Sequence, residues 1–154
     1  MFIEDRYEVL IDDTVSLFEF VSEGKNGKIK KVVRYNETNL KGMYNLGFGD
    51  YDEDTGLISD TVVTDNGDSE KVLATVAATV WAFIEMYPKA YIILIGSTPA
   101  RTRLYRMGIA KYLSKISEDF EVQGLQNSSW KKFAPNGNYT AFLIKKKIYI
   151  NDYK

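Results

Sequence analysis

The sequence contains no cysteine and no histidine among its 154 residues. These absences exclude disulfides, thiolate nucleophiles and the usual Cys/His zinc sites, and they remove the commonest general base. Catalysis would have to depend on carboxylates or on Lys, Tyr, Ser, Thr or Arg side chains. We therefore predict no metal and no other cofactor, and a non-enzymatic role is favoured over an enzymatic one.

Long hydrophobic runs are also missing. No stretch approaches the roughly 18 apolar residues that a membrane span requires. The first residues, Met1–Arg6, lack the basic start and apolar core of a signal peptide. We expect a cytoplasmic protein with no membrane association, folded as a single domain over residues 1–154, since 45% of its residues are hydrophobic.

The net charge is only −1, but the charges are distributed unevenly along the chain. Residues 1–70 contain 16 acidic and 7 basic residues, whereas residues 101–154 contain 11 basic and 4 acidic residues. The basic third either docks on the acidic half of the same molecule or faces a polyanion. The sequence pI of about 5.6 is low for a duplex-binding protein and favours internal neutralisation.

Residues 6–64 predict an antiparallel β-meander of about five strands. Segments rich in Val, Ile, Phe and Tyr alternate there with short turns. The segments are Tyr7–Ile11, Val15–Val21, Lys28–Tyr35, Tyr44–Asp50 and Leu57–Thr64. Short connections favour pairing of successive strands in antiparallel fashion.

The second half predicts helices alternating with strands. A helix over 69–87, begun by Asp68 or Ser69, precedes a buried strand over 91–95 and a second helix over 98–117. A strand over 121–126, a polar loop over 127–138 and a C-terminal strand over 139–147 follow. The predicted fold class is α+β, a meander followed by α-β-α-β(β), with two main helices packed on the sheet.

The first predicted helix is apolar nearly all round, because no charge occurs between Lys71 and Glu85. Such a helix is buried on two sides, either by another part of the fold or by another subunit. Val72–Ile84 is therefore a candidate surface for a homo-oligomer or for a protein partner, as in a toxin–antitoxin-like pair.

The start of the second predicted helix is the candidate functional site. Thr98 is a predicted N-cap and Pro99 occupies the first helical position, while Gly96 permits a close backbone approach. Arginines follow immediately, although the positive end of a helix disfavours nearby cations. Either an anion or a buried carboxylate must then balance them. The candidate anion-binding residues are Ser97, Thr98, Arg101, Arg103 and Arg106.

The alternative is structural: Arg101 pairs with a carboxylate of the meander, and Arg103 and Arg106 are solvated. Further along this helix, Gly108 costs about 1 kcal/mol relative to alanine, which indicates a close helix crossing or a short break.

The acidic segment 50–56 resembles a calcium-binding loop only superficially. Its sixth position is Thr55 rather than glycine and its twelfth is Thr61 rather than glutamate, so a hairpin turn is favoured. Its carboxylates support a third hypothesis, a phosphate-handling enzyme that uses Arg101 with Asp50, Asp52 or Asp60.

Two lysine-rich segments complete the candidates: the hairpin from Lys25 to Arg34 and the run Lys145–Lys147. Cations interleaved with aromatic residues such as Tyr35 and Phe48 can bind single-stranded nucleic acid. Lysines on exposed strands more often prevent edge-to-edge association.

Four segments resemble an uncharacterised family of bacterial proteins of about 150 residues, a domain of unknown function. They are Phe18–Gly24, Gly27–Val33, Asn45–Asp52 and Gly96–Ile109. The resemblance covers nearly the whole chain and implies no activity. From the residues themselves, the leading hypothesis is a binding module whose arginine-bearing helix start engages an anionic partner such as single-stranded nucleic acid.

Overall fold

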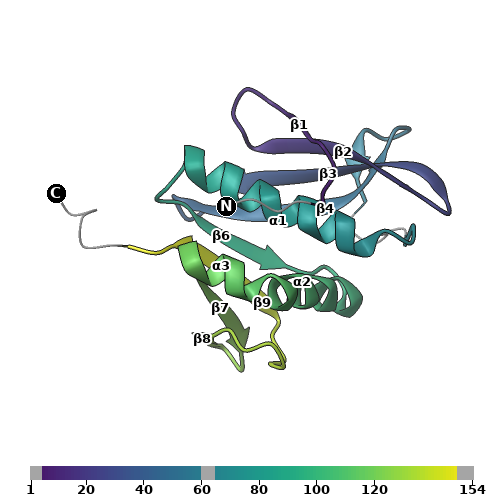
Figure 1. Cartoon of the computed structure of the whole chain (residues 1–154). Helices are drawn as coiled ribbons and strands as arrows, with labels where there is room; N and C mark the ends of the chain where they lie inside the picture. The colour runs from purple at the N-terminus through teal and green to yellow at the C-terminus, as the bar shows by residue number, and fades with distance from the viewer. Residues whose placement is uncertain (1–4, 60–64, 149–154) are drawn as a thin grey trace.

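The computed structural model describes residues 5–59 and 65–148, and within them the chain forms a mixed α+β domain. The strands belong to one open sheet with the order β1-β2-β3-β4-β6-β9-β7-β8, and β5 pairs with β4 outside this path. All neighbouring strands are antiparallel except β4 and β6, which run parallel. The predicted fold class is therefore confirmed (Figure 1).

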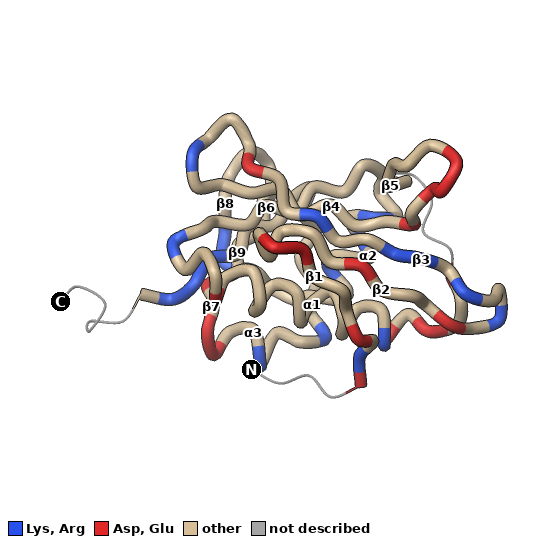
Figure 2. Tube along the Cα trace, turned by 90° about the horizontal axis from the view of Figure 1, so that it is seen from above, with Lys and Arg blue, Asp and Glu red and all other residues tan. Residues whose placement is uncertain are grey.

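The N-terminal meander consists of β1 (Leu10–Ile11), β2 (Leu17–Gly24), β3 (Gly27–Glu37), β4 (Met43–Asp52) and β5 (Leu57–Ile58). Alternate side chains of β2, starting at Phe18, point into the core, as expected for a sheet with one covered face. Acidic positions of β2 lie beside basic positions of β3 (Figure 2), and the ion pair between Lys30 and Glu19 joins these strands. The remainder of the strand predicted over Leu57–Thr64, residues 60–64, lies outside the described residues.

Helix α1 (Ser69–Met86) connects the meander to β6 (Tyr91–Ile95), which pairs with β4 so that Tyr44 lies opposite Ile92. A parallel pair needs a crossover, which α1 provides. β6 has the bounds predicted from the sequence.

The second predicted helix is two helices, α2 (Pro99–Lys111) and α3 (Leu113–Asp119). The prediction of one continuous helix over 98–117 is wrong because Tyr112 leaves the helical region, with φ −104° and ψ 15°. Gly108 does mark a close helix crossing, since a Cβ atom at that position would lie 3.1 Å from Cδ2 of Leu73 on α1.

The C-terminal strands are β7 (Phe120–Gln126), β8 (Ser129–Lys132) and β9 (Ala141–Lys146). β8 lies inside the segment predicted as a polar loop, and that prediction is wrong. Its four exposed residues form an edge strand that pairs only with β7 among the described strands, so no buried apolar pattern identifies it.

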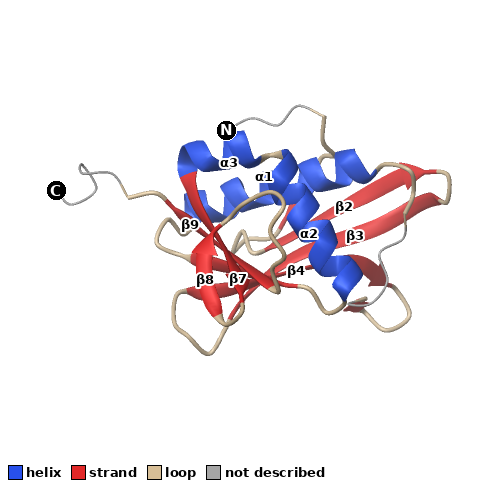
Figure 3. Ribbon diagram, turned by 90° about the horizontal axis from the view of Figure 1, so that it is seen from below, coloured by secondary structure: helices blue, strands red, loops and turns tan. Residues whose placement is uncertain are grey.

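All three helices lie on the same face of the sheet (Figures 1 and 3). The main core lies between this face and α1, where the ring of Phe83 stacks on that of Tyr35 with centroids 4.2 Å apart. The second side of α1 packs on α3 and β7: Trp81 donates to Asp119 and its ring contacts Phe120. Another part of the same fold thus buries both sides of this helix.

Tyr35 makes the stability of this core dependent on pH. Burial raises the pKa of Tyr35 above its ordinary value near 10, although its hydroxyl hydrogen-bonds that of Thr79. Above pH 10 the unfolded chain therefore releases this proton while the folded chain retains it, so stability falls as pH rises. Between pH 10 and 11 we expect the wild type to lose about 1 kcal/mol more stability than Tyr35→Phe, which lacks this titrating group. Urea unfolding at both pH values measures this difference, and equal losses in both proteins would contradict it.

Candidate functional site

Helix α2 begins as the sequence predicts. The Thr98 side chain accepts a hydrogen bond from the backbone N–H of Arg101 at 3.2 Å, and Pro99 occupies the first helical position. A Cβ atom at Gly96 would collide with the backbone nitrogen and hydroxyl of Thr102. The close approach at Gly96 is therefore to the first turn of α2, and glycine is required for this tight connection between β6 and α2.

Arg101 is buried although it carries a charge, with only 6% of its surface exposed. Its Nη2 donates to the backbone carbonyl of Ser59 at 3.2 Å. Within residues 5–59 and 65–148, no carboxylate forms an ion pair with Arg101, Arg103 or Arg106. In the same ranges no fully buried side-chain nitrogen or oxygen lacks a hydrogen-bond partner.

Arg101 lines a cavity of about 350 Å³, which we call the Arg101 cavity. It lies between the starts of α1 and α2 and above β3. Its described lining consists of Lys31, Asp65, Asn66, Asp68, Ser69, Val72, Leu73, Thr98, Ala100, Arg101 and Leu104.

Lys31 adds a second buried cation to this cavity. Its side chain is 1% exposed, and its Nζ lies 2.6 Å from Oδ1 of Asp50, whose side chain is 14% exposed. The sequence pattern places Lys31 in a solvated basic hairpin, so this site residue was missed. Strand alternation was the available signal, because Lys31 shares the inward face of β3 with Val33 and Tyr35.

The start of α1 forms the opposite wall. Asp68 is the N-cap residue but makes no side-chain capping bond. Its carboxylate instead accepts hydrogen bonds from the hydroxyls of Tyr7 and Ser22. Burial and the bond to Asp68 raise the pKa of Tyr7. The first backbone N–H groups of α1 consequently receive no side-chain cap beside the cavity.

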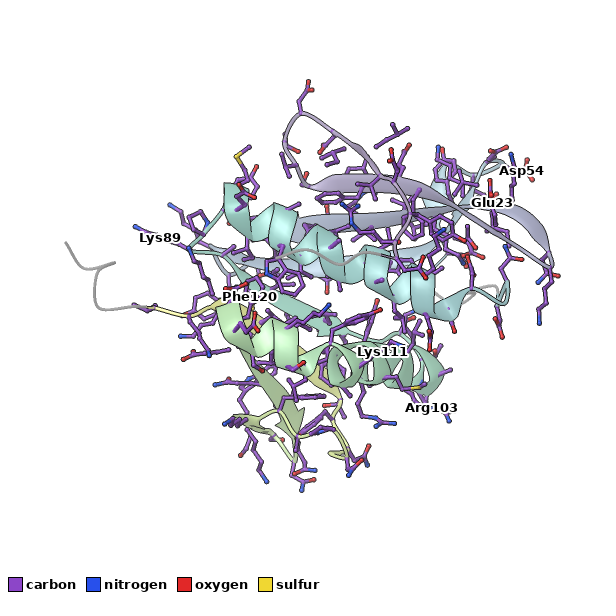
Figure 4. The ribbon with its side chains drawn as sticks, viewed as in Figure 1. Glu23, Asp54, Lys89, Arg103, Lys111 and Phe120 are labelled. Atoms are coloured by element: carbon purple, nitrogen blue, oxygen red, sulfur yellow. The ribbon has the colours of Figure 1, made fainter. Side chains whose placement is uncertain are left out.

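Arg103 and Arg106 lie on a different surface, which we call the Arg103 groove. Its described lining consists of Gly96, Ser97, Thr98, Pro99, Thr102, Arg103, Arg106, Asn138, Tyr139 and Thr140, around a volume of about 530 Å³. Arg103 is exposed on α2 and points away from the sheet (Figure 4). Arg106 donates to the backbone carbonyl of Pro135 at 3.1 Å.

The five predicted anion-binding residues thus divide between two places. Arg101 lines the cavity, Ser97, Arg103 and Arg106 line the groove, and Thr98 lines both. A helix presents side chains two positions apart on different faces, so Arg101 and Arg103 cannot share one small ligand easily.

The carboxylates of the enzyme hypothesis are also separated. Asp50 contacts Lys31, whereas Asp52 accepts backbone hydrogen bonds from Asp54 and Thr55 within the β4–β5 turn. Asp60 lies outside the described residues. No group of three or more acidic side chains in the described part of the chain is arranged to hold a metal ion.

The basic C-terminal third is only partly neutralised by the acidic half. Among ion pairs of described residues, Lys111 with Glu70 at 2.8 Å is the one that joins these regions. The hydrogen bond between these two groups lowers the pKa of Glu70 and raises that of Lys111. The pair links α2 to the first turn of α1.

The candidate partner surface Val72–Ile84 is largely covered within the chain. Six of its apolar side chains are buried against the sheet or the other helices: Val72, Ala74, Val76, Val80, Phe83 and Ile84. A protein partner would have only the half-buried remainder of α1 to contact.

Within the two described ranges, no helix combines the length and apolar character needed to cross a bilayer. No curated protein and no solved structure matches the chain. A family model, described as a family of unknown function, matches residues 3–147. This match agrees with the resemblance found in the sequence, and the chain therefore belongs to that family, DUF6934.

Proposed function

We propose that this protein is a binding module for an anionic ligand, which it holds in the Arg101 cavity. The observation that carries the proposal is Arg101 itself. It is a nearly buried cation that lines a cavity, and no carboxylate of the described residues forms an ion pair with it. A buried charge is costly unless it is paired, so an anion is the expected occupant.

The surroundings of Arg101 strengthen such binding. Hydrogen bonds between a guanidinium and an oxyanion are charge-assisted and can be bidentate. Lys31 lines the same cavity and adds positive potential, although Asp50 offsets part of it. These two cations come from elements far apart in the sequence.

Single-stranded nucleic acid is the second candidate ligand, and the Arg103 groove is the surface that favours it. Arg103 is exposed, and no ion pair with a described carboxylate holds it. A polymer needs an open surface for successive phosphates, and the groove is the more open of the two. The Arg101 cavity suits a small anion instead.

A matched pair of variants tests the first candidate. Arg101→Gln removes a charge inside the cavity, and Arg103→Gln removes the same charge outside it. We expect Arg101→Gln to weaken phosphate binding about 10- to 100-fold, since a hydrogen bond to a charged group contributes about 1.5–3 kcal/mol. Arg103→Gln should bind phosphate as the wild type does. Isothermal titration calorimetry measures both, with thermal melts to verify folding.

The same pair distinguishes the second candidate. If nucleic acid binds in the groove, Arg103→Gln will lose affinity for a short oligonucleotide, and Arg101→Gln will change little. Fluorescence anisotropy at two salt concentrations measures this affinity. If phosphate binds equally to Arg101→Gln and the wild type, the cavity is not an anion site and the proposal is wrong.

A further inference from the structure

The Arg101 cavity is lined by side chains of both charges, and this combination specifies the ligand class. Lys31 and Arg101 are its cations. Asp65 and Asp68, from the segment that leads into α1, supply carboxylate oxygens. A bare inorganic anion would be attracted by the cations and repelled by the carboxylates.

The carboxylates of Asp65 and Asp68 can accept hydrogen bonds from a ligand. One oxygen of Asp65 accepts from the backbone of Gly67. Both described side-chain bonds of Asp68 go to a single oxygen, Oδ2. An ionised carboxylate has about four acceptor sites on its two oxygens, so each residue can accept further hydrogen bonds from hydroxyl groups.

The size of the cavity agrees with a ligand larger than phosphate. Its volume of about 350 Å³ lies within the roughly 300–1,000 Å³ range of small-molecule sites. Val72, Leu73 and Leu104 contribute apolar surface to the lining, which we call the apolar wall. This wall suits the carbon skeleton or the ring of a ligand that spans the cavity.

From this arrangement we infer that the ligand is a small phosphorylated polyol, a sugar phosphate or a nucleoside monophosphate. Its phosphate lies at Arg101, where the charge of Lys31 adds positive potential, and its hydroxyl groups donate to Asp65 and Asp68. The inference rests on the proposed function, because it assigns the anionic group of the same ligand to Arg101.

The experiment compares inorganic phosphate, ribose 5-phosphate and AMP by isothermal titration calorimetry. The variants are Asp65→Asn, inside the cavity, and Asp54→Asn, in the exposed β4–β5 turn outside it. The amide that replaces the Asp65 carboxylate would keep an oxygen for the Gly67 N–H, so folding should be retained. If AMP binds more tightly than ribose 5-phosphate, its base contacts the apolar wall and the ligand is a nucleoside monophosphate. If the two bind equally, the ligand is a sugar phosphate.

We expect ribose 5-phosphate to bind the wild type about tenfold more tightly than phosphate, which corresponds to one good additional hydrogen-bonded contact. Asp65→Asn should weaken ribose 5-phosphate about tenfold while leaving phosphate unchanged or tighter, and Asp54→Asn should change neither. This inference alone would be overturned if the wild type bound phosphate, ribose 5-phosphate and AMP with equal affinity. It would also be overturned if Asp65→Asn lost as much affinity for phosphate as for ribose 5-phosphate. Failure of all three probes to bind would overturn the proposed function as well.

Discussion

Replacing Phe83 by alanine is expected to lower the free energy of unfolding by about 3–5 kcal/mol. Phe83 has no exposed surface and lies at the centre of an aromatic cluster. Its ring contacts those of Tyr35, Tyr44 and Tyr87, with centroid distances of 4.2, 5.0 and 4.9 Å. Alanine would leave a cavity and remove three ring contacts at once.

Urea unfolding of the Phe83→Ala variant measures this loss, and Met86→Ala provides the control on the same helix. Met86 is 52% exposed, so its truncation should change stability by no more than about 0.5 kcal/mol. Similar losses in both variants would show that α1 does not pack on the sheet as described.

Replacing Lys31 by methionine has the second large expected effect. It removes the cation at 2.6 Å from Asp50 and leaves that carboxylate largely buried. Breaking a buried pair by removing one partner costs about 3–5 kcal/mol, mostly because the remaining charge stays desolvated. The cost should therefore be smaller in the Lys31→Met, Asp50→Asn double variant than in the single variant.

The double-mutant cycle, measured by urea unfolding, separates this coupling from the loss of packing. Lys28→Met is the matched control, because Lys28 is 78% exposed and its contact with Glu23 at 3.7 Å contributes little. Strictly additive effects at Lys31 and Asp50 would mean that the two charges do not support each other.

The sequence predicts most of the fold because its strongest signals are local. Alternation in β2 and β3 and the apolar run of β6 identify those strands within a few residues. The break at Tyr112 and the strand β8 were not predictable in this way. Tyr112 has no helix-breaking side chain, and β8 consists of exposed residues that are ordered by pairing with β7.

The candidate site was predictable only in part, for a related reason. The cap at Thr98 and the unusual position of Arg101 are visible in a few consecutive residues. Lys31 reaches the same cavity from β3, and Asp65 and Asp68 reach it from the segment before α1. Only tertiary structure brings these side chains together. The same structure separates Arg103 from Arg101, although they are two residues apart.

The central claim is that Arg101 binds an anion inside the cavity. The most direct measurement is a phosphate titration that follows the side-chain Nε–H signals of the arginines by NMR. We expect the Arg101 signal to shift and saturate, while those of Arg103 and Arg106 move little. An Arg101 signal that stays fixed while the other two respond would contradict this claim.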